Sequence, residues 1–217
     1  MKSRIQKSVS ILSATLAIAL PLQAANFTDD FESGLSQWTG KSGGSHNGLL
    51  VADPLSSGRG NVLTFSDFGY GGDLFSSLTI SNSGAVVVSF DYLGLADHDS
   101  IPGDFGGFLG IAKSLTPVNE GQDIIWYAGT VDSYPSLLTT LMDDGLWHRY
   151  EFTVDGDALG AFRLTLEDFV GSGGSPCDVY FDNISVIATP NQVPEPTTAS
   201  LGLLGGLATL VMLRRRN

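Results

Sequence analysis

The chain has 217 residues, with 23 acidic and 11 basic side chains and a formal net charge of −12. Residues 26–192 hold 22 of the acidic but only five of the basic side chains, which gives that segment a net charge of −17. Nucleic-acid binding needs a basic surface, so this composition argues against it. The single cysteine, Cys177, excludes an intramolecular disulfide.

The first 25 residues have the three parts of a secretory signal peptide. Lys2, Arg4 and Lys7 form a positive start, residues 9–22 are mostly apolar, and small residues follow. The apolar stretch is short for a permanent membrane helix. We therefore expect residues 1–25 to form a signal helix that directs export and is absent from the mature protein.

Short apolar runs separated by glycine recur through residues 26–188, a length that suits one domain. In residues 85–93, valine and aromatic side chains alternate with others, which predicts a strand with one buried face. Further runs of this kind occupy residues 62–65, 77–80, 108–112, 124–127, 147–154, 162–166 and 179–187. About eight to ten strands at this spacing predict an all-β domain, an antiparallel β-sandwich or jelly roll.

Three short motifs give this domain a family resemblance. Residues 30–34 followed by Trp38, and residues 179–186, resemble the first and last strands of carbohydrate-binding-module-like jelly rolls. Residues 144–152, which begin Asp-Gly-Leu-Trp-His, resemble a strand of laminin-G and concanavalin-like sandwiches. The resemblance supports the fold, but such sandwiches host many unrelated functions.

The resemblance to the jelly-roll modules also implies a structural calcium ion between the first and last strands. Glu32 and Asp182 stand at the positions that often bind this ion in those modules, and Asp30 could join them. Calcium takes about six to eight oxygen ligands, so backbone carbonyls would have to complete the site. The alternative is that these carboxylates face solvent and only keep the domain soluble.

Patterns of catalytic residues are mostly absent from the sequence. It contains no H-E-x-x-H metal-binding helix. The sandwich glycosidases use an E-x-D-x-x-E strand, and the nearest match, Glu167-Asp168, lacks the second carboxylate partner. We therefore expect a protein that is not an enzyme, and a glycan-active enzyme is the less favoured alternative.

Aromatic side chains are the candidates for ligand binding, because sugar sites use exposed aromatic rings for stacking. Trp126 and Tyr127 lie in an alternating strand, so one of the two should face outward and line a shallow glycan groove. Each ring could instead belong to the core. The competing hypothesis is a structural surface or biofilm-matrix protein without a ligand site.

The C-terminal end carries three elements in order. They are Val193 with Pro194, Glu195 and Pro196, then apolar residues 197–213, then Arg214, Arg215 and Arg216. A helix over residues 197–213 would rise about 25 Å, near the lower limit for crossing a membrane. The arginines after it should stay in the cytoplasm, which places the domain outside.

This order resembles the PEP-CTERM sorting signal of Gram-negative bacteria that make exopolysaccharide. The resemblance implies that an exosortase recognises Pro194, Glu195 and Pro196 within the signal at 193–217, after a spacer at 189–192. The arginine cluster would act as the stop signal. We therefore expect a protein of the cell surface or extracellular matrix, held in the membrane by its C-terminal helix until processing. Its domain would bind exopolysaccharide or other glycans.

Overall fold

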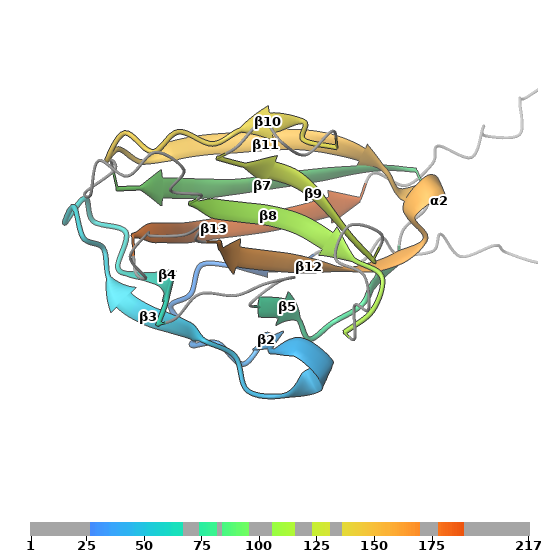
Figure 1. Cartoon of the computed structure of the whole chain (residues 1–217), viewed down its shortest axis with the longest axis horizontal. Coiled ribbons are helices and arrows are strands. Elements are labelled where there is room, and N and C mark those ends of the chain that lie inside the picture. Colours follow the sequence, from blue (N-terminus) through green and yellow to red (C-terminus); the bar gives the residue numbers. More distant parts are fainter. Residues whose placement is uncertain are drawn as a thin grey trace, which may run out of the picture.

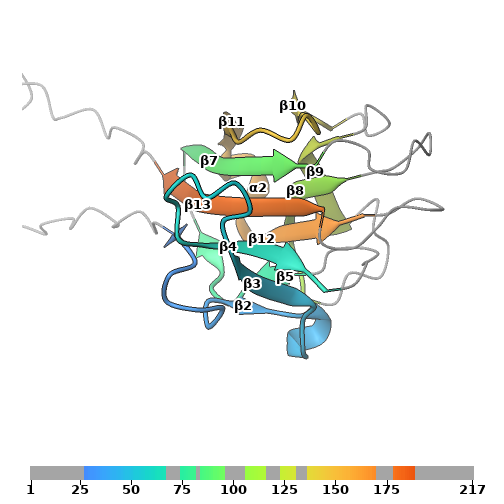
Figure 2. The same cartoon turned by 90° about the vertical axis from the view of Figure 1, so that its left-hand side faces the viewer.

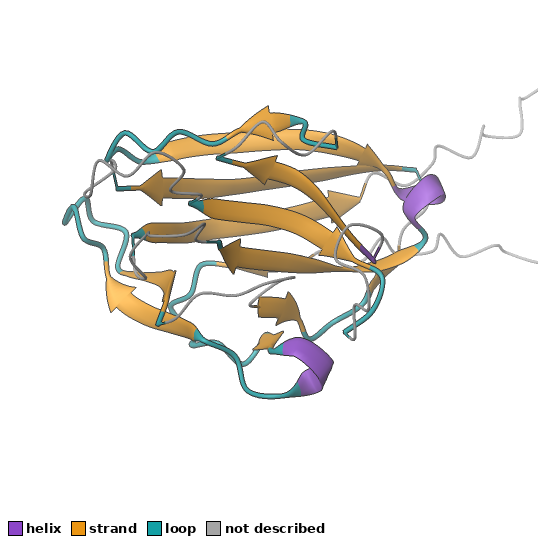
Figure 3. Ribbon diagram, viewed as in Figure 1, coloured by secondary structure: helices purple, strands orange, loops and turns teal. Residues whose placement is uncertain are grey.

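The computed structural model describes residues 27–66, 74–81, 84–95, 106–115, 123–130, 136–169 and 178–188. They form two β-sheets that pack face to face (Figure 1 and Figure 2). Short helical elements within these residues include the 3-10 helix η1, Lys41–Gly43, and the helix α2, Gly156–Leu159 (Figure 3). The prediction of an all-β sandwich is confirmed.

The first sheet has the strand order β11-β7-β13-β4-β3, and β1 also pairs with β13. All of its strand pairs are antiparallel. In chain order its strands are β1 (Phe27–Asp29), β3 (Gly48–Ala52), β4 (Asn61–Phe65), β7 (Ala85–Gly94), β11 (His148–Asp155) and β13 (Val179–Ala188). The first and last strands of the domain are therefore neighbours, as the jelly-roll resemblance implies.

The second sheet has the order β10-β9-β8-β12-β5-β2, and β6 pairs with β12. Its pairs are antiparallel except for β10 and β9, which run parallel. In chain order its strands are β2 (Trp38–Thr39), β5 (Leu74–Ser76), β6 (Ile80–Ser81), β8 (Gly107–Ala112), β9 (Ile124–Gly129), β10 (Thr139–Thr140) and β12 (Ala161–Asp168).

The alternation predicted for residues 85–93 positions the charged groups discussed below. In β7, Val86, Val88 and Phe90 belong to the main core between the sheets. Side chains alternate along a strand, so Ser89 and Asp91 point to the outer face of the first sheet. Burial of the apolar face therefore fixes which side chains of this strand can form a surface site.

Strand β13 contains a bulge on this outer face. Its register with β7 shifts between Asp182 and Ser185, and Asn183 has a φ of 50°. A bulge adds one residue to a strand, and asparagine tolerates positive φ better than most residues. As a result the side-chain amide of Asn183 donates hydrogen bonds to both Asp91 and Asp182. Asp182 also accepts one from Arg59.

Several sequence predictions lie outside the described residues. They include the signal peptide at 1–25, the spacer at 189–192, and the segment 193–217 with its predicted membrane helix. In the part of the chain that the structure describes, no helix is long and apolar enough to cross a membrane.

Candidate functional site

Three neighbouring strands place charged side chains next to one another on the outer face of the first sheet. Arg149 of β11 is the register partner of Asp91 in β7, and Asp91 is the partner of Asp182 in β13. Asp91 is 5% exposed and Asp182 is 1% exposed. Two buried carboxylates on adjacent strands lose hydration and repel each other, so the fold must supply donors and positive charge beside them.

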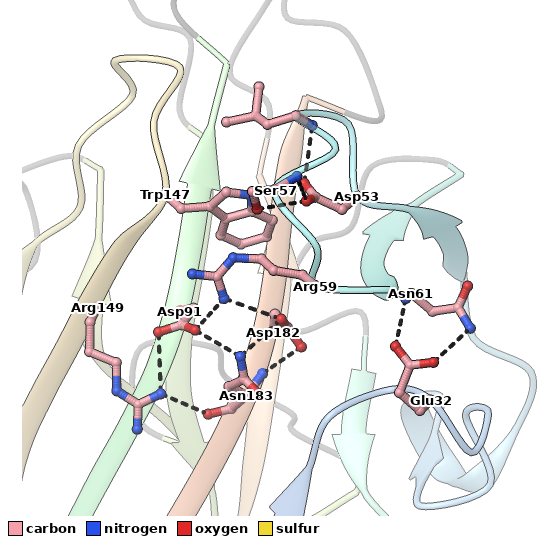
Figure 4. Close-up of polar contacts among 11 residues, drawn as sticks. Glu32, Asp53, Ser57, Arg59, Asn61, Asp91, Trp147, Arg149, Asp182 and Asn183 are labelled. Atoms are coloured by element: carbon pink, nitrogen blue, oxygen red, sulfur yellow. Dashed lines mark hydrogen bonds and ion pairs between the residues drawn. The ribbon is translucent and has the colours of Figure 1, made fainter.

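Arg59, from the loop between β3 and β4, supplies positive charge to both carboxylates. Its Nη1 forms ion pairs with Asp91 and, at 3.3 Å, with Asp182 (Figure 4). The guanidinium lies 4.5 Å from the centre of the Trp147 ring, a cation–π contact. The side-chain amide of Asn183 donates hydrogen bonds to Asp91 at 2.8 Å and to Asp182 at 3.0 Å. The buried acid pair is therefore neutralised and hydrogen-bonded within the protein.

The pKa values of the two carboxylates shift in opposite directions. Burial raises the pKa of Asp182, and the hydrogen bonds from Asn183 and Arg59 offset this only in part. Asp91 is buried too, but hydrogen bonds from two arginines and Asn183 outweigh burial, and the pKa of Asp91 is lowered. Asp91 is thus the carboxylate that keeps its negative charge most firmly, and both Arg59 and Arg149 bind it.

The loop that carries Arg59 is itself held by Asp53. This carboxylate accepts hydrogen bonds from the Leu55 amide, from the amide and hydroxyl of Ser57, and from Trp147 Nε1 at 3.0 Å. Burial tends to raise the pKa of Asp53, but these hydrogen bonds outweigh it and lower the pKa to about 2. Trp147 therefore connects the loop to the sheet twice, through its N–H group to Asp53 and through its ring face to Arg59.

An Asp53→Asn variant tests how much the loop depends on ionised Asp53. A carboxylate with a depressed pKa stabilises the fold above its unfolded pKa, and this contribution is lost as pH falls toward the folded pKa. The pKa changes from 3.8 to about 2 on folding. Allowing for solvent screening, we expect the variant to lose about 1 kcal/mol of unfolding free energy near neutral pH. The difference from the wild type should shrink between about pH 4 and pH 2. Urea denaturation across this range measures it, and a difference that does not vary with pH would contradict the prediction.

The two terminal nitrogens of its guanidinium hold Arg149 in place through hydrogen bonds. Nη1 donates to Asp91 Oδ1 at 3.2 Å and to the Asn183 carbonyl oxygen at 3.4 Å, and Nη2 donates to Ser89 Oγ at 2.8 Å. The side chain is nevertheless 54% exposed. Arg149 is thus held in one orientation by β7 and β13 while part of it remains accessible to a ligand.

A polar surface depression of about 480 Å³ adjoins Arg149. Its walls come from the N-terminal segment 28–37, from the bulged part of β13 at 183–185, and from Arg149 of β11. Eight of the nine residues that line it have polar or charged side chains, the exception being Ile184. This depression, with Arg149 at its edge, is the candidate ligand site.

The three predicted calcium ligands have separate partners in the structure. Glu32 Oε1 accepts a hydrogen bond from the Asn61 amide at 2.7 Å, whereas Asp182 belongs to the Arg59 cluster (Figure 4). Asp30 Oδ1 accepts from the Glu32 amide at 3.2 Å. Among the described residues, no three histidine, cysteine, aspartate or glutamate side chains gather as a metal site. These contacts do not bring the three carboxylates together around one ion, and the calcium site stays a prediction.

The two predicted ligand-binding aromatic residues pack against other side chains. Trp126 faces away from the main core but is only 5% exposed, because it lies in a second apolar cluster with Phe108, whose ring centre is 5.6 Å away. Tyr127 is half-buried, and its ring centre lies 5.6 Å from that of Phe152. Their role in a glycan groove stays a prediction.

Sequence patterns do not single out Arg59, Arg149 or Asn183. Arg59 and Arg149 lie 32 and 58 residues from Asp91 along the chain. Strand register brings Arg149 to Asp91, and the loop between β3 and β4 brings Arg59 there. The available signal is the scarcity of positive charge, because the acidic domain has only five basic residues. A basic residue that faces a buried carboxylate is strongly attracted to it.

Comparison with known proteins identifies the C-terminal end. A family model described as the PEP-CTERM protein-sorting motif matches residues 192–216. The chain carries a PEP-CTERM sorting motif. This motif contains the predicted Pro194, Glu195, Pro196 and the three arginines, and it indicates exosortase-sorted export to the cell surface or the extracellular space. The recognition of the sorting signal from the sequence is confirmed.

Solved structures with a similar arrangement are distant in sequence. A cleaved adhesin domain of Lys-gingipain from Porphyromonas gingivalis is 12% identical with a TM-score of 0.49, over 76% of this chain and 99% of that one. The tandem CBM22 domain of Xyn10C from Paenibacillus barcinonensis is 16% identical with a TM-score of 0.49, over 75% and 50% of the two chains. No curated protein matches the chain.

Proposed function

We propose that the β-sandwich is a glycan-binding domain that acts at the cell surface or in the extracellular matrix, with exopolysaccharide as its ligand. The sorting motif supports the location, and exosortase would remove the C-terminal tail during sorting. The observation that carries the proposal is the polar depression beside Arg149, whose hydroxyl, amide, carboxylate and guanidinium groups match the hydrogen-bonding groups of sugars.

Polar groups rather than stacked rings would hold this ligand. The exposed large hydrophobic side chains of the described residues are leucines, one methionine and one isoleucine, and none is aromatic. A carbohydrate can still bind through hydrogen bonds when the donors and acceptors are held in place beforehand. The anchoring of Arg149 by Asp91 and Ser89 provides such preorganisation. The domain would bind its ligand without transforming it.

Affinity electrophoresis tests the proposal with mature protein purified from the producing cells, whose intact mass also reports both processing steps. We expect exopolysaccharide from the same cells, cast into the gel, to retard the protein. A Ser185→Trp variant fills the depression from β13 and should migrate unretarded. Thr153→Trp is the matched control, because Thr153 is exposed on β11 and does not line the depression.

Two outcomes would contradict this function. Unretarded migration of the wild-type protein would favour the alternative, a structural surface or matrix protein without a ligand site. Equal retardation of the Ser185→Trp and wild-type proteins would move the site away from the depression. In either outcome, loss of residues 197–217 from the intact mass would still support processing by exosortase.

A further inference from the structure

The hydrogen bonds of Arg149 leave one edge of its guanidinium available. A guanidinium carries five N–H groups in a fixed plane. Nη1 uses both of its groups, on Asp91 and on the Asn183 carbonyl, and Nη2 uses one on Ser89. Ser89 and Asp91 both belong to β7, so the terminal edge of the guanidinium faces that strand. The Nε–H group and the second Nη2–H group remain, and they lie parallel on the side edge.

This side edge, with its two parallel N–H groups, is a preformed donor fork. Parallel N–H groups of an arginine bind either the two oxygens of a carboxylate or two oxygens on adjacent carbon atoms of a sugar. Because the other three N–H groups are already bound, the fork cannot rotate freely to meet a ligand. Its orientation is set by β7 and β13, and Arg149 lines the depression. The geometry therefore fits a ligand group with two neighbouring oxygens.

The charges around the fork distinguish between these two ligand groups. The charges of Arg149 and Arg59 are already matched by Asp91 and Asp182. Asp29 and Asp30 line the same depression and add negative charge to it. A carboxylate ligand would enter a site with no uncompensated positive charge, on a domain whose net charge is −17. A neutral sugar avoids this repulsion, and its hydroxyl protons can be donated to the exposed Asp30 carboxylate.

We propose that the depression binds a neutral sugar unit, with two adjacent sugar oxygens accepting hydrogen bonds from Nε and Nη2 of Arg149. This inference rests on the proposed glycan-binding function and specifies the ligand class. Arg149 is the residue that determines specificity. Neighbouring hydroxyl groups, rather than acid groups, are the feature of the polysaccharide that the domain recognises.

Chemical modification of one polysaccharide preparation separates the two ligand classes. The exopolysaccharide of the producing cells is used as isolated, after reduction of its carboxyl groups to alcohols, and after periodate cleavage of its vicinal diols. We expect the protein to bind the carboxyl-reduced polymer at least as well as the native one. Binding should be lost after periodate treatment. Loss of binding on carboxyl reduction would overturn the neutral-sugar proposal while leaving glycan binding intact, whereas no binding to native polymer would overturn the proposed function itself.

Variants of two basic residues complete the test. Arg149→Lys keeps the charge beside Asp91 but removes the fork, and we expect about tenfold weaker binding to the carboxyl-reduced polymer. Lys113→Arg is the matched control: Lys113 is exposed and does not line the depression, so this variant should bind like the wild type. Thermal melting of each variant shows whether it is folded. A folded Arg149→Lys variant with wild-type affinity would overturn the proposal.

Discussion

Replacing Arg59 with methionine is expected to lower the free energy of unfolding by about 3 kcal/mol. Methionine keeps an unbranched apolar side chain next to Trp147 but removes the charge that neutralises Asp91 and Asp182. These carboxylates are 5% and 1% exposed, so water cannot replace the lost guanidinium without opening the loop. Urea denaturation at neutral pH measures the loss. Lys113→Met is the matched control, because Lys113 is exposed and its removal should change stability by less than about 0.5 kcal/mol.

A second substitution shows whether the loss comes from charge. In the Arg59→Met background, Asp182→Asn removes the carboxylate that has lost its ion pair with Arg59, while keeping the shape of the side chain. We expect this double variant to recover part of the stability lost by the single variant, since Asp91 still binds Arg149. If Asp182→Asn destabilises the Arg59→Met protein further, the loss arises from packing of the loop and not from the buried charges.

The strands that the sequence predicts well are those that bury one continuous apolar face. Residues 85–93 and 179–187 alternate clearly, and they correspond to β7 and β13, the two central strands of the first sheet. The pattern at 77–80 is misleading, because only Ile80 of that run lies in a strand and Leu78 is 60% exposed. Short strands such as β1 and β10 hold too few residues to show a period, and pairing with a neighbouring strand forms them.

The candidate site depends on information that the sequence pattern does not contain. Asp182 is singled out by its place in the last strand, but its cationic neighbour in the structure is Arg59, 123 residues away. The bulge at Asn183 turns a second side chain toward Asp91, and a strict two-residue alternation cannot predict this. The depression beside Arg149 requires the pairing of β1 with β13, because segment 28–37 forms one of its walls. Long-range register, not local composition, assembles these groups.

Phe181, in the same central strand β13, is a sensitive core position. Phe181 is fully buried, and its ring centre lies 5.2 Å from that of Tyr92, 6.1 Å from that of Phe90 and 6.2 Å from that of Phe65. Phe181→Ala would leave a cavity among three aromatic rings, so we expect a loss of about 4 kcal/mol of unfolding free energy. Urea denaturation measures the change.

Ile187, on the same strand, is the matched control for this prediction. Its side chain is 48% exposed on the outer face, so Ile187→Ala should cost about 1 kcal/mol or less. Equal losses for the two variants would contradict the assignment of the core to the inner face of β13. Because Asp182 and Asn183 directly follow Phe181, the same cavity should also loosen Arg149. The Phe181→Ala protein is therefore expected to bind polysaccharide more weakly even under conditions in which it remains folded.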